Sequence, residues 1–155
     1  MNVATASDTY IVFELAGTNY GVLSNSVQQV QMVEQITPVP NAIAVVEGVV
    51  HTRGRVIPVL NLRVRFGFEK IPFDLRARLV VVNVGGRIVG LLVDTAREFV
   101  RIPASSIEPT PEGITGLSGK YLEGIASMKG RLVLMLNLGA VIDVGDMEAM
   151  IAENG

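Results

Sequence analysis

Short apolar runs separated by glycine-containing turns occupy most of the chain. Tyr10–Phe13 is followed by a turn and then by the second apolar run Tyr20–Leu23, and the same arrangement occurs three more times. Such pairs are typical of β-hairpins, because glycine adopts the positive φ that a tight turn needs. The four turns are predicted at Ala16-Gly17-Thr18-Asn19, Arg53-Gly54-Arg55, Gly85-Gly86 and Lys129-Gly130-Arg131. The pattern therefore predicts a mainly all-β fold.

Helical spacing occurs in only two places. Ser24 or Asn25 is predicted to cap a short helix that carries Val27, Val30 and Val33 on one face. Residues 140–152 also place apolar side chains at helical spacing, which predicts a C-terminal helix that packs back on the body or frays. The two Pro-x-Pro segments, 38–40 and 109–111, predict loops or extended chain.

The sequence contains an internal duplication. When the chain is shifted by 76 positions, residues 47–62 lie over residues 123–138 with 7 of 16 positions identical. The first hairpin repeats at an offset of 69 and the Pro-x-Pro segment at an offset of 71. Each copy alone would bury only a marginal core, so we expect two small barrels that share one hydrophobic core. A groove between the barrels is then the expected binding surface.

The composition excludes several classes of protein. The 155 residues include 49% hydrophobic and 18% charged residues, which fits a packed globular chain rather than a disordered one. There is no cysteine, so thiolate catalysis and cysteine-based metal sites are excluded. The formal net charge of −2 creates no field that attracts nucleic acid or an anionic membrane. No export signal or membrane span is evident, and a cytoplasmic location is expected.

No constellation of residues predicts catalysis. His51 is the only histidine and has no acidic residue at ligand spacing, so a surface or turn position is favoured over a metal site. Asp94 and Glu98 could be paired carboxylates, but capping or a solvated turn is the favoured interpretation of Asp94. Gly85-Gly86 lacks the lysine and the spacing of a phosphate loop. We therefore expect no enzymatic activity, no metal and no cofactor.

Arginine outnumbers lysine by ten to three, and Arg53, Arg55, Arg63 and Arg65 lie within 13 positions. Arginine is enriched at protein interfaces, although its aliphatic stem can equally cover a scaffold surface. The scaffold interpretation is favoured for Arg55, which is matched by Arg131, whereas interface and scaffold remain balanced for Arg53, which is matched by Lys129. For Val27 and Val30, core packing is the usual meaning of such a pair, yet the second copy has Ala96 and Phe99 there.

The chain resembles the CheW family, whose members couple chemoreceptors to the histidine kinase CheA. The resemblance covers residues 8–143 in order. It rests on Tyr10–Leu15, Val27–Val30, Ile36–Asn41, Gly48–Arg63, Arg78–Val82, Val89–Asp94, Ile107–Pro109 and Tyr121–Gly124. It implies a domain over residues 8–145, made of two SH3-like five-stranded barrels at about 8–75 and 76–145. Strand exchange between them is left open, and residues 146–155 form a tail.

The same resemblance implies partners and site residues. The partners would be the regulatory domain of a CheA-type kinase and the cytoplasmic tip of a receptor helical bundle, which would associate the protein with receptor arrays at the membrane. The implied receptor groove contains Val27, Val30, Arg53 and Gly54, and the implied kinase-binding candidates are Gln29, Val39, Gly48 and Pro58.

The chain departs from the family pattern at several contact positions. His51-Thr52 replaces the usual Asn-Leu, Gln29 and Gln31 replace a glutamate and an arginine, and Asn61 replaces a common aspartate. Lost charges can change the choice of partner, so an adaptor of a parallel pathway is an alternative. Two others are a fragment of a larger signalling protein, although Met1 and the polar tail favour a stand-alone chain, and a nucleic-acid-binding barrel, which charge and aromatic content disfavour.

Overall fold

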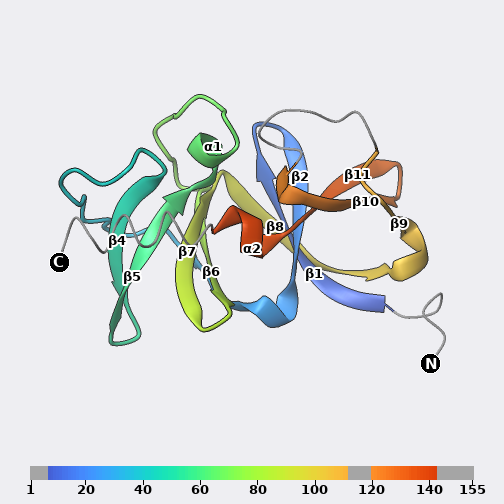
Figure 1. The fold of residues 1–155 in the computed structure, drawn as a ribbon, viewed down its shortest axis with the longest axis horizontal. Helices are drawn as coiled ribbons and strands as arrows, with labels where there is room; N and C mark the ends of the chain where they lie inside the picture. The colour runs from blue at the N-terminus through green and yellow to red at the C-terminus, as the bar shows by residue number, and fades with distance from the viewer. Residues whose placement is uncertain (1–6, 112–119, 143–155) are drawn as a thin grey trace.

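The computed structural model describes residues 7–111 and 120–142, and its architecture is mainly β, which confirms the predicted fold class (Figure 1). The strands are β1 (Ser7–Leu15), β2 (Thr18–Leu23), β3 (Val27–Met32), β4 (Val46–Thr52), β5 (Arg55–Asn61), β6 (Arg78–Val84), β7 (Arg87–Val93), β8 (Thr95–Pro103), β9 (Ile107–Glu108), β10 (Leu122–Met128) and β11 (Arg131–Leu136). The helices are short: the 3-10 turns η2 (Ser24–Ser26) and η3 (Ala104–Ser106), and the α-helices α1 (Leu62–Arg65) and α2 (Leu138–Val141).

The strands form two sheets, each curled around its own apolar cluster. The six-stranded sheet, here called barrel A, has the order β8-β1-β2-β11-β10-β9, counting the two-residue strand β9. The five-stranded sheet, barrel B, has the order β3-β6-β7-β5-β4. Val12, Val133 and Met135 fill barrel A, whereas Ile57, Leu79 and Val81 fill barrel B. Alternation of inward and outward residues along each strand produces these interiors.

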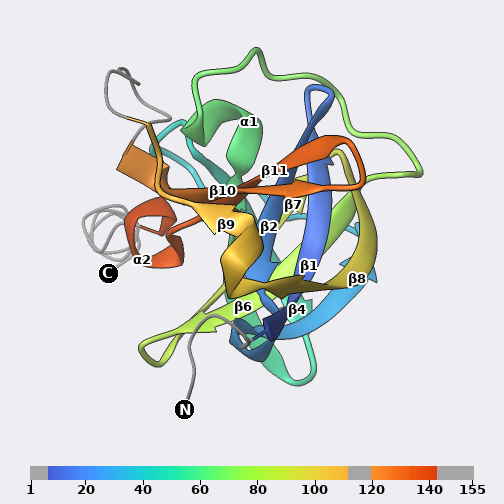
Figure 2. The same ribbon diagram turned by 90° about the vertical axis from the view of Figure 1, so that its right-hand side faces the viewer.

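The two sequence copies exchange hairpins between the barrels. The β1–β2 hairpin of the first copy joins barrel A through parallel pairing of β2 with β11, and Figure 2 shows it beside β10 and β11. The β6–β7 hairpin of the second copy joins barrel B through parallel pairing of β7 with β5. Each barrel therefore contains strands from both sides of residue 75.

A third apolar cluster lies between the barrels and binds them together. It includes Phe13 and Leu15 of β1, Leu60 of β5 and Leu91 of β7, all 0% exposed. Four aromatic rings run through it in series, with centroids 5.8 Å apart for Phe13–Tyr20, 5.4 Å for Tyr20–Phe66 and 5.3 Å for Phe66–Tyr121. These rings join β1 and β2 to the residue after α1 and to the residue before β10, so burial of the shared core couples the two copies.

The predicted helix beyond Ser24 is wrong, because Val27–Met32 forms strand β3. A β-bulge at Gln28 shifts the register, so that Val27 lies opposite Val82 and Gln29 opposite Val81. The extra residue changes the phase of alternation and places Val27 and Val30 on the same face of the strand, towards the central cluster. A bulged strand thus reproduces the spacing of three that had suggested a helix.

The four predicted hairpins are confirmed, and their turns share one geometry. Ala16-Gly17, Arg53-Gly54, Gly85-Gly86 and Lys129-Gly130 all have positive φ at both residues. Such turns match the twist of antiparallel strands. At the other end of the chain α2 covers only Leu138–Val141, and the rest of the predicted C-terminal helix lies outside the described residues. None of the helices within the described ranges is long and apolar enough to cross a membrane.

Candidate functional site

The tip of the β4–β5 hairpin presents Arg53 and Gly54 to solvent, with φ of 51° and 79°. A non-glycine residue rarely adopts such a φ, and Lys129 occupies the equivalent tip in barrel A with a φ of 49°. Within residues 7–111 and 120–142 no carboxylate forms an ion pair with Arg53. Its side chain is exposed to solvent.

Gln29 lies next to this tip, on the face of β3 that points towards barrel B. Its Nε2 donates a 3.1 Å hydrogen bond to Thr52 Oγ1 and a further bond to Gln31 Oε1, and Thr52 Oγ1 donates to Gln31 Oε1 over 3.2 Å. This neutral cluster joins β3 and β4, the two end strands of barrel B. Gln29 and Arg53 line one open groove of about 220 Å³, together with Arg55.

Val27 and Val30 do not line this groove. Both are half-buried and pack on the central cluster from the other face of β3. Their equivalents in the second copy, Ala96 and Phe99, lie on β8, the end strand of barrel A. Ala96 packs on the same central cluster, and Phe99 is 68% exposed opposite Ile11. Phe99 is thus a contact candidate that sequence reasoning did not assign to a site, although its alignment with Val30 at an offset of 69 pointed to it.

Gly48 lies buried in β4, below the loop that contains Val39. Thr37 and Val49 exchange two backbone hydrogen bonds of 2.8 Å across this junction. A Cβ atom on Gly48 would lie 2.3 Å from Thr37 O, so this backbone approach requires glycine. Gly48 therefore shapes the surface without contacting a partner through a side chain.

Pro58 is half-buried on β5, opposite Val49, and Val39 is half-buried in the adjacent loop. Val49 forms its backbone hydrogen bonds with Thr37 and not with Pro58. The absence of an N–H group on Pro58 therefore removes no hydrogen bond between β5 and β4. Next along the outward face of β5, Val56 is 63% exposed, and its equivalent Leu132 is 59% exposed. Val39, Gly48 and Pro58 thus lie around Val49, whereas Gln29 belongs to the groove beside Arg53.

The four clustered arginines have different roles. Arg63 donates from Nε to Asp94 Oδ1 at 2.7 Å and from Nη2 to Asp94 Oδ2 at 2.6 Å. Arg65 donates to Val141 O at 2.9 Å and to Ala140 O at 3.2 Å, and lies 5.1 Å from the centre of the Tyr121 ring. These two residues are structural, so only Arg53 and Arg55 of the cluster are exposed at the hairpin tip.

Asp94, for which the sequence suggested a cap or a solvated turn, lies half-buried in the bend between β7 and β8. Its Oδ2 also accepts a 2.9 Å hydrogen bond from the backbone N–H of Ala16, and it ties together the β7–β8 junction, α1 and the β1–β2 turn. Burial raises the pKa of Asp94, but the bonds from Arg63 and Ala16 outweigh it and hold that pKa below its ordinary value. The bond to Asp94 in turn raises the pKa of Arg63. Glu98, the other residue of the possible carboxylate pair, forms an ion pair with Arg131.

The described residues contain no group of three His, Asp or Glu side chains placed to hold a metal ion. His51 is exposed on β4, opposite Val56. The contact candidates are instead an exposed cation, exposed aliphatic side chains and Phe99 on the end or outer strands of the barrels. Such a mixture is suited to contacts between proteins.

Comparison with known proteins places the chain in one family. The CheW-like domain matches residues 9–145, almost the whole described fold. The chain belongs to the CheW-like domain family. This membership confirms the resemblance found in the sequence and gives the chain an adaptor role in chemotaxis-like signalling.

Individual relatives match along nearly the full fold. Chemotaxis protein CheW from Klebsiella aerogenes is 27% identical and covers 92% of this chain and 86% of its own length. Protein FrzA from Myxococcus xanthus is 27% identical over 95% of this chain and 92% of its own. The crystal structure of the scaffolding protein TtCheW from Thermoanaerobacter tengcongensis superposes with a TM-score of 0.83 at 31% identity, covering 91% of this chain and 96% of that one.

Proposed function

We propose that this CheW-like chain is a non-catalytic adaptor that binds the cytoplasmic tip of a chemoreceptor and the regulatory domain of a CheA-type histidine kinase. The observation that carries the proposal is the match of the family over residues 9–145 on a fold that leaves contact residues exposed on several strands. Through its receptor, the adaptor takes its place in arrays at the inner face of the membrane.

The receptor contact involves β3, β8 and the Arg53-Gly54 tip. Val27 and Val30 on β3 pack beside the shared core, and Phe99 on β8 is exposed; all three are apolar side chains on the end strands of the two barrels. An α-helical bundle presents apolar and acidic side chains along its surface, which fits apolar contacts bordered by the free guanidinium group of Arg53.

The kinase contact involves the outward face of β4–β5 and the adjoining loop. Val39, Pro58 and Val56 offer apolar surface there, and Gly48 permits the backbone approach that holds the loop in place. β4 and β3 are at opposite ends of the sheet order of barrel B. Apart from the Arg53-Gly54 tip, which belongs to the β4–β5 hairpin, the two proposed contacts lie on different strands, so one adaptor can bind both partners.

A second candidate is an adaptor of a parallel pathway with another receptor and kinase. The neutral cluster of Gln29, Gln31 and Thr52 favours it, because charge on a contact surface selects partners. The similarity to FrzA is also compatible with it. The identity of the kinase that co-purifies with the protein from its own cells decides between the two.

Charge reversal at Arg53 tests the receptor contact. Arg53→Glu replaces a cation with an acid at an exposed tip, so we expect receptor-tip affinity to fall by about tenfold or more, or about 1.4 kcal/mol. Co-sedimentation with a receptor cytoplasmic fragment in ordered arrays measures this loss, while binding of the kinase regulatory domain stays unchanged.

Lys129→Glu is the matched control. Lys129 has the same exposure class and nearly the same φ at the equivalent tip of barrel A, so the variant repeats the charge reversal outside the proposed contact. Receptor binding should remain at the wild-type level in this control. Equal binding by Arg53→Glu and wild type, or equal loss in both variants, contradicts the assignment of Arg53.

A further inference from the structure

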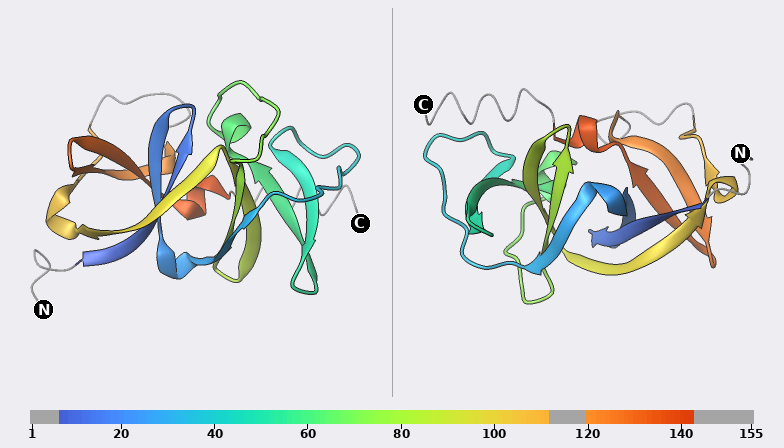
Figure 3. Two further views of the ribbon diagram at one scale, coloured as in Figure 1. Left: turned by 180° about the vertical axis from the view of Figure 1, so that it is seen from behind. Right: turned by 90° about the horizontal axis from the view of Figure 1, so that it is seen from below.

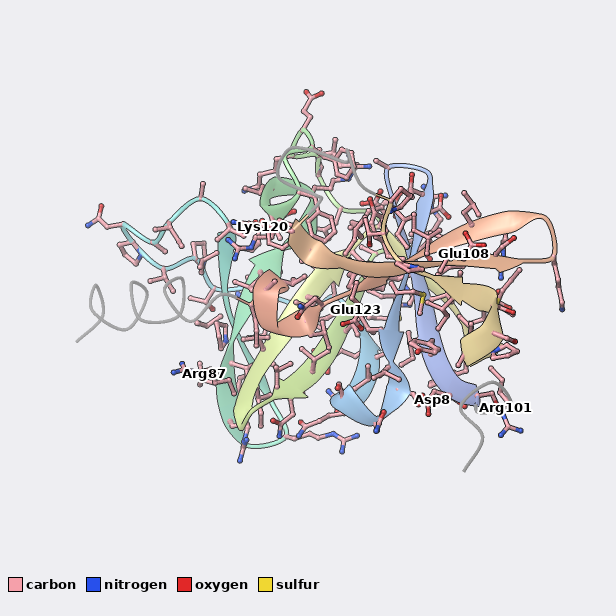
Figure 4. The ribbon with its side chains drawn as sticks, turned by 45° about the vertical axis from the view of Figure 1, so that its right-hand side comes forward. Asp8, Arg87, Arg101, Glu108, Lys120 and Glu123 are labelled. Carbon is pink, nitrogen blue, oxygen red and sulfur yellow. The ribbon has the colours of Figure 1, made fainter. Side chains whose placement is uncertain are left out.

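Three described segments at one end of barrel B contribute arginine side chains and no acidic side chain. The β4–β5 and β6–β7 tips both point to the lower edge of the views in Figures 1 and 3 (left), and residues near the start of β3 and near both tips line one groove. The segments 24–29, 51–56 and 83–88 contain Arg53, Arg55 and Arg87 but no aspartate or glutamate. Figure 4 shows Arg87 projecting outward from β7, on the side away from Asp8, Glu108 and Glu123.

These three arginines lack an ion-pair partner among residues 7–111 and 120–142. The corresponding end of barrel A differs, because Arg131 pairs with Glu98 there. Arg131 corresponds to Arg55, since each follows its turn and lies opposite the last residue of the preceding strand: Met128 in one copy and Thr52 in the other. The same arginine thus pairs with a glutamate in barrel A, whereas in barrel B no carboxylate of the described ranges pairs with it.

Gln29 occupies the position where Glu98 lies in the other copy. Gln29 lies opposite Val81, and the exposed Glu98 lies opposite Val12, each next to a register shift. At the same offset of 69, Asn25 replaces Asp94. Of these two carboxylates, Glu98 is the one that pairs with Arg131, whereas Asp94 pairs with Arg63. Gln29 therefore marks the position where the first copy lacks the counter-charge that the second copy supplies to Arg131.

The groove beside Arg55 has the dimensions and chemistry for an acidic side chain. It has a volume of about 220 Å³, an apolar base of Ile57, Val81 and Ile88, and a rim that includes Gln29, Arg53 and Arg55. We propose that this end of barrel B is a docking site for an acidic segment of a partner protein, with a glutamate or aspartate side chain pairing with Arg55. The partner supplies the carboxylate that Glu98 supplies within barrel A.

The surroundings favour a protein carboxylate over a phosphate. An apolar base contacts the methylene groups of a glutamate side chain, while the planar guanidinium fork pairs with its carboxylate. No aromatic residue lines the groove to stack on a base. The site goes beyond the proposed receptor and kinase contacts and shares only Arg53 and Gln29 with their candidates.

Gln29→Glu tests the proposal by restoring the carboxylate within the chain. The probe is a hexaglutamate peptide, compared with hexaglutamine, titrated into the full-length ¹⁵N-labelled protein. In the wild type we expect hexaglutamate to shift the amide signals of Gln29, Thr52 and Gly54, and hexaglutamine to shift none. In Gln29→Glu the new carboxylate pairs with Arg55, so peptide affinity should fall by about tenfold. The barrel should remain folded, because Glu98 is accommodated at the equivalent position.

Gln35→Glu is the control for bulk charge, since Gln35 is exposed and does not line the groove. It should change peptide affinity less than twofold. Equal weakening in both variants, or no shift at the groove amides, overturns the proposal. Tighter binding of phosphatidylglycerol vesicles or inorganic polyphosphate than of hexaglutamate, unaffected by Gln29→Glu, also overturns it in favour of general anion attraction. Because this probe contains neither receptor nor kinase, its outcome is independent of the proposed function.

Discussion

Gly48 illustrates how one missing side chain determines the local backbone. A Cβ atom there would lie 2.3 Å from Thr37 O and 2.9 Å from Ile36 Cγ2, and φ is 153°. Gly48→Ala should therefore separate the loop from β4 and break the two Thr37–Val49 hydrogen bonds. We expect the free energy of unfolding to fall by about 3–4 kcal/mol, from about 1 kcal/mol per bond and about 1–2 kcal/mol for the unfavourable φ.

Gly54→Ala separates these two causes. Gly54 has a φ of 79°, but a Cβ atom added there would have no other atom within 4 Å, so only the backbone contribution applies, about 1–2 kcal/mol. Urea unfolding of both variants measures the difference. Equal loss of stability at the two glycines would contradict the close approach at Gly48.

At the scale of single residues, the sequence predicted more about turns than about contacts. Repeated glycines identified all four hairpin tips, because backbone positions with positive φ favour glycine. The pairing of Arg63 with Asp94, 31 positions apart, could not be recognised in the same way, because no local pattern links the two residues. Arg55 and Arg131 were both assigned to scaffold because they align, yet only Arg131 has a carboxylate partner among the described residues. Identity between copies reports the shared backbone and not the local charge balance.

Elements are held together by the ion pair of Arg63 and Asp94, which links α1, the β7–β8 junction and the β1–β2 turn. Asp94→Asn should lower the free energy of unfolding at pH 7 by about 1–3 kcal/mol, because it weakens charge-assisted hydrogen bonds at a mostly buried site. The pKa of Asp94 is lower in the folded chain, so its contribution is complete above about pH 4 and is lost as pH falls through the folded value.

Chemical denaturation of wild type and Asp94→Asn between pH 7 and pH 2 measures this dependence. The gap in stability between the two proteins should narrow below about pH 4. Asp74→Asn is the control: the pKa of Asp74 is lowered by hydrogen bonds from Arg76, but this carboxylate is exposed and bonds only within its own loop. It should unfold like the wild type. A gap that stays constant down to pH 2 would exclude Asp94 as the titrating group.

Strand β3 shows why element type was harder to predict than element position. Val27, Val30 and Val33 fit a helical spacing of three, and the bulge at Gln28 reproduces that spacing in a strand for Val27 and Val30. Val33 lies beyond β3 and packs on the cluster inside barrel B instead. Pairing with β6, a strand of the other sequence copy, decides between the two, and local pattern contains no information about that partner. The bulge nevertheless places Val27 and Val30 on one face. The prediction that these two side chains lie on the same face is therefore correct although the element is a strand and not a helix.

At the scale of the whole molecule, the duplication predicted a shared core, and the fold adds the exchange of hairpins. Two complete barrels side by side would have satisfied the repeat equally well. The exchange depends on the parallel pairing of β2 with β11 and of β7 with β5. Because the two copies are similar in sequence, the pattern of one strand does not show which of the two copies it pairs with. The TM-score of 0.83 with TtCheW extends the same architecture to a relative at 31% identity.

This exchange predicts that neither sequence copy folds alone. Residues 1–75 contain β1 to β5, and without the second copy they lose the pairing of β1 with β8, β2 with β11, β3 with β6 and β5 with β7. The central cluster also draws Phe13 and Leu60 from one copy and Leu91 and Leu136 from the other. Fragments 1–75 and 76–155 should each give poorly dispersed ¹H–¹⁵N spectra, and an equimolar mixture should recover the spectrum of the intact chain.

Because both copies contribute to one shared cluster, the intact chain should also unfold in a single urea transition. A well-dispersed spectrum from either fragment alone would show that each copy forms its own barrel and that the exchanged hairpins contribute little to stability.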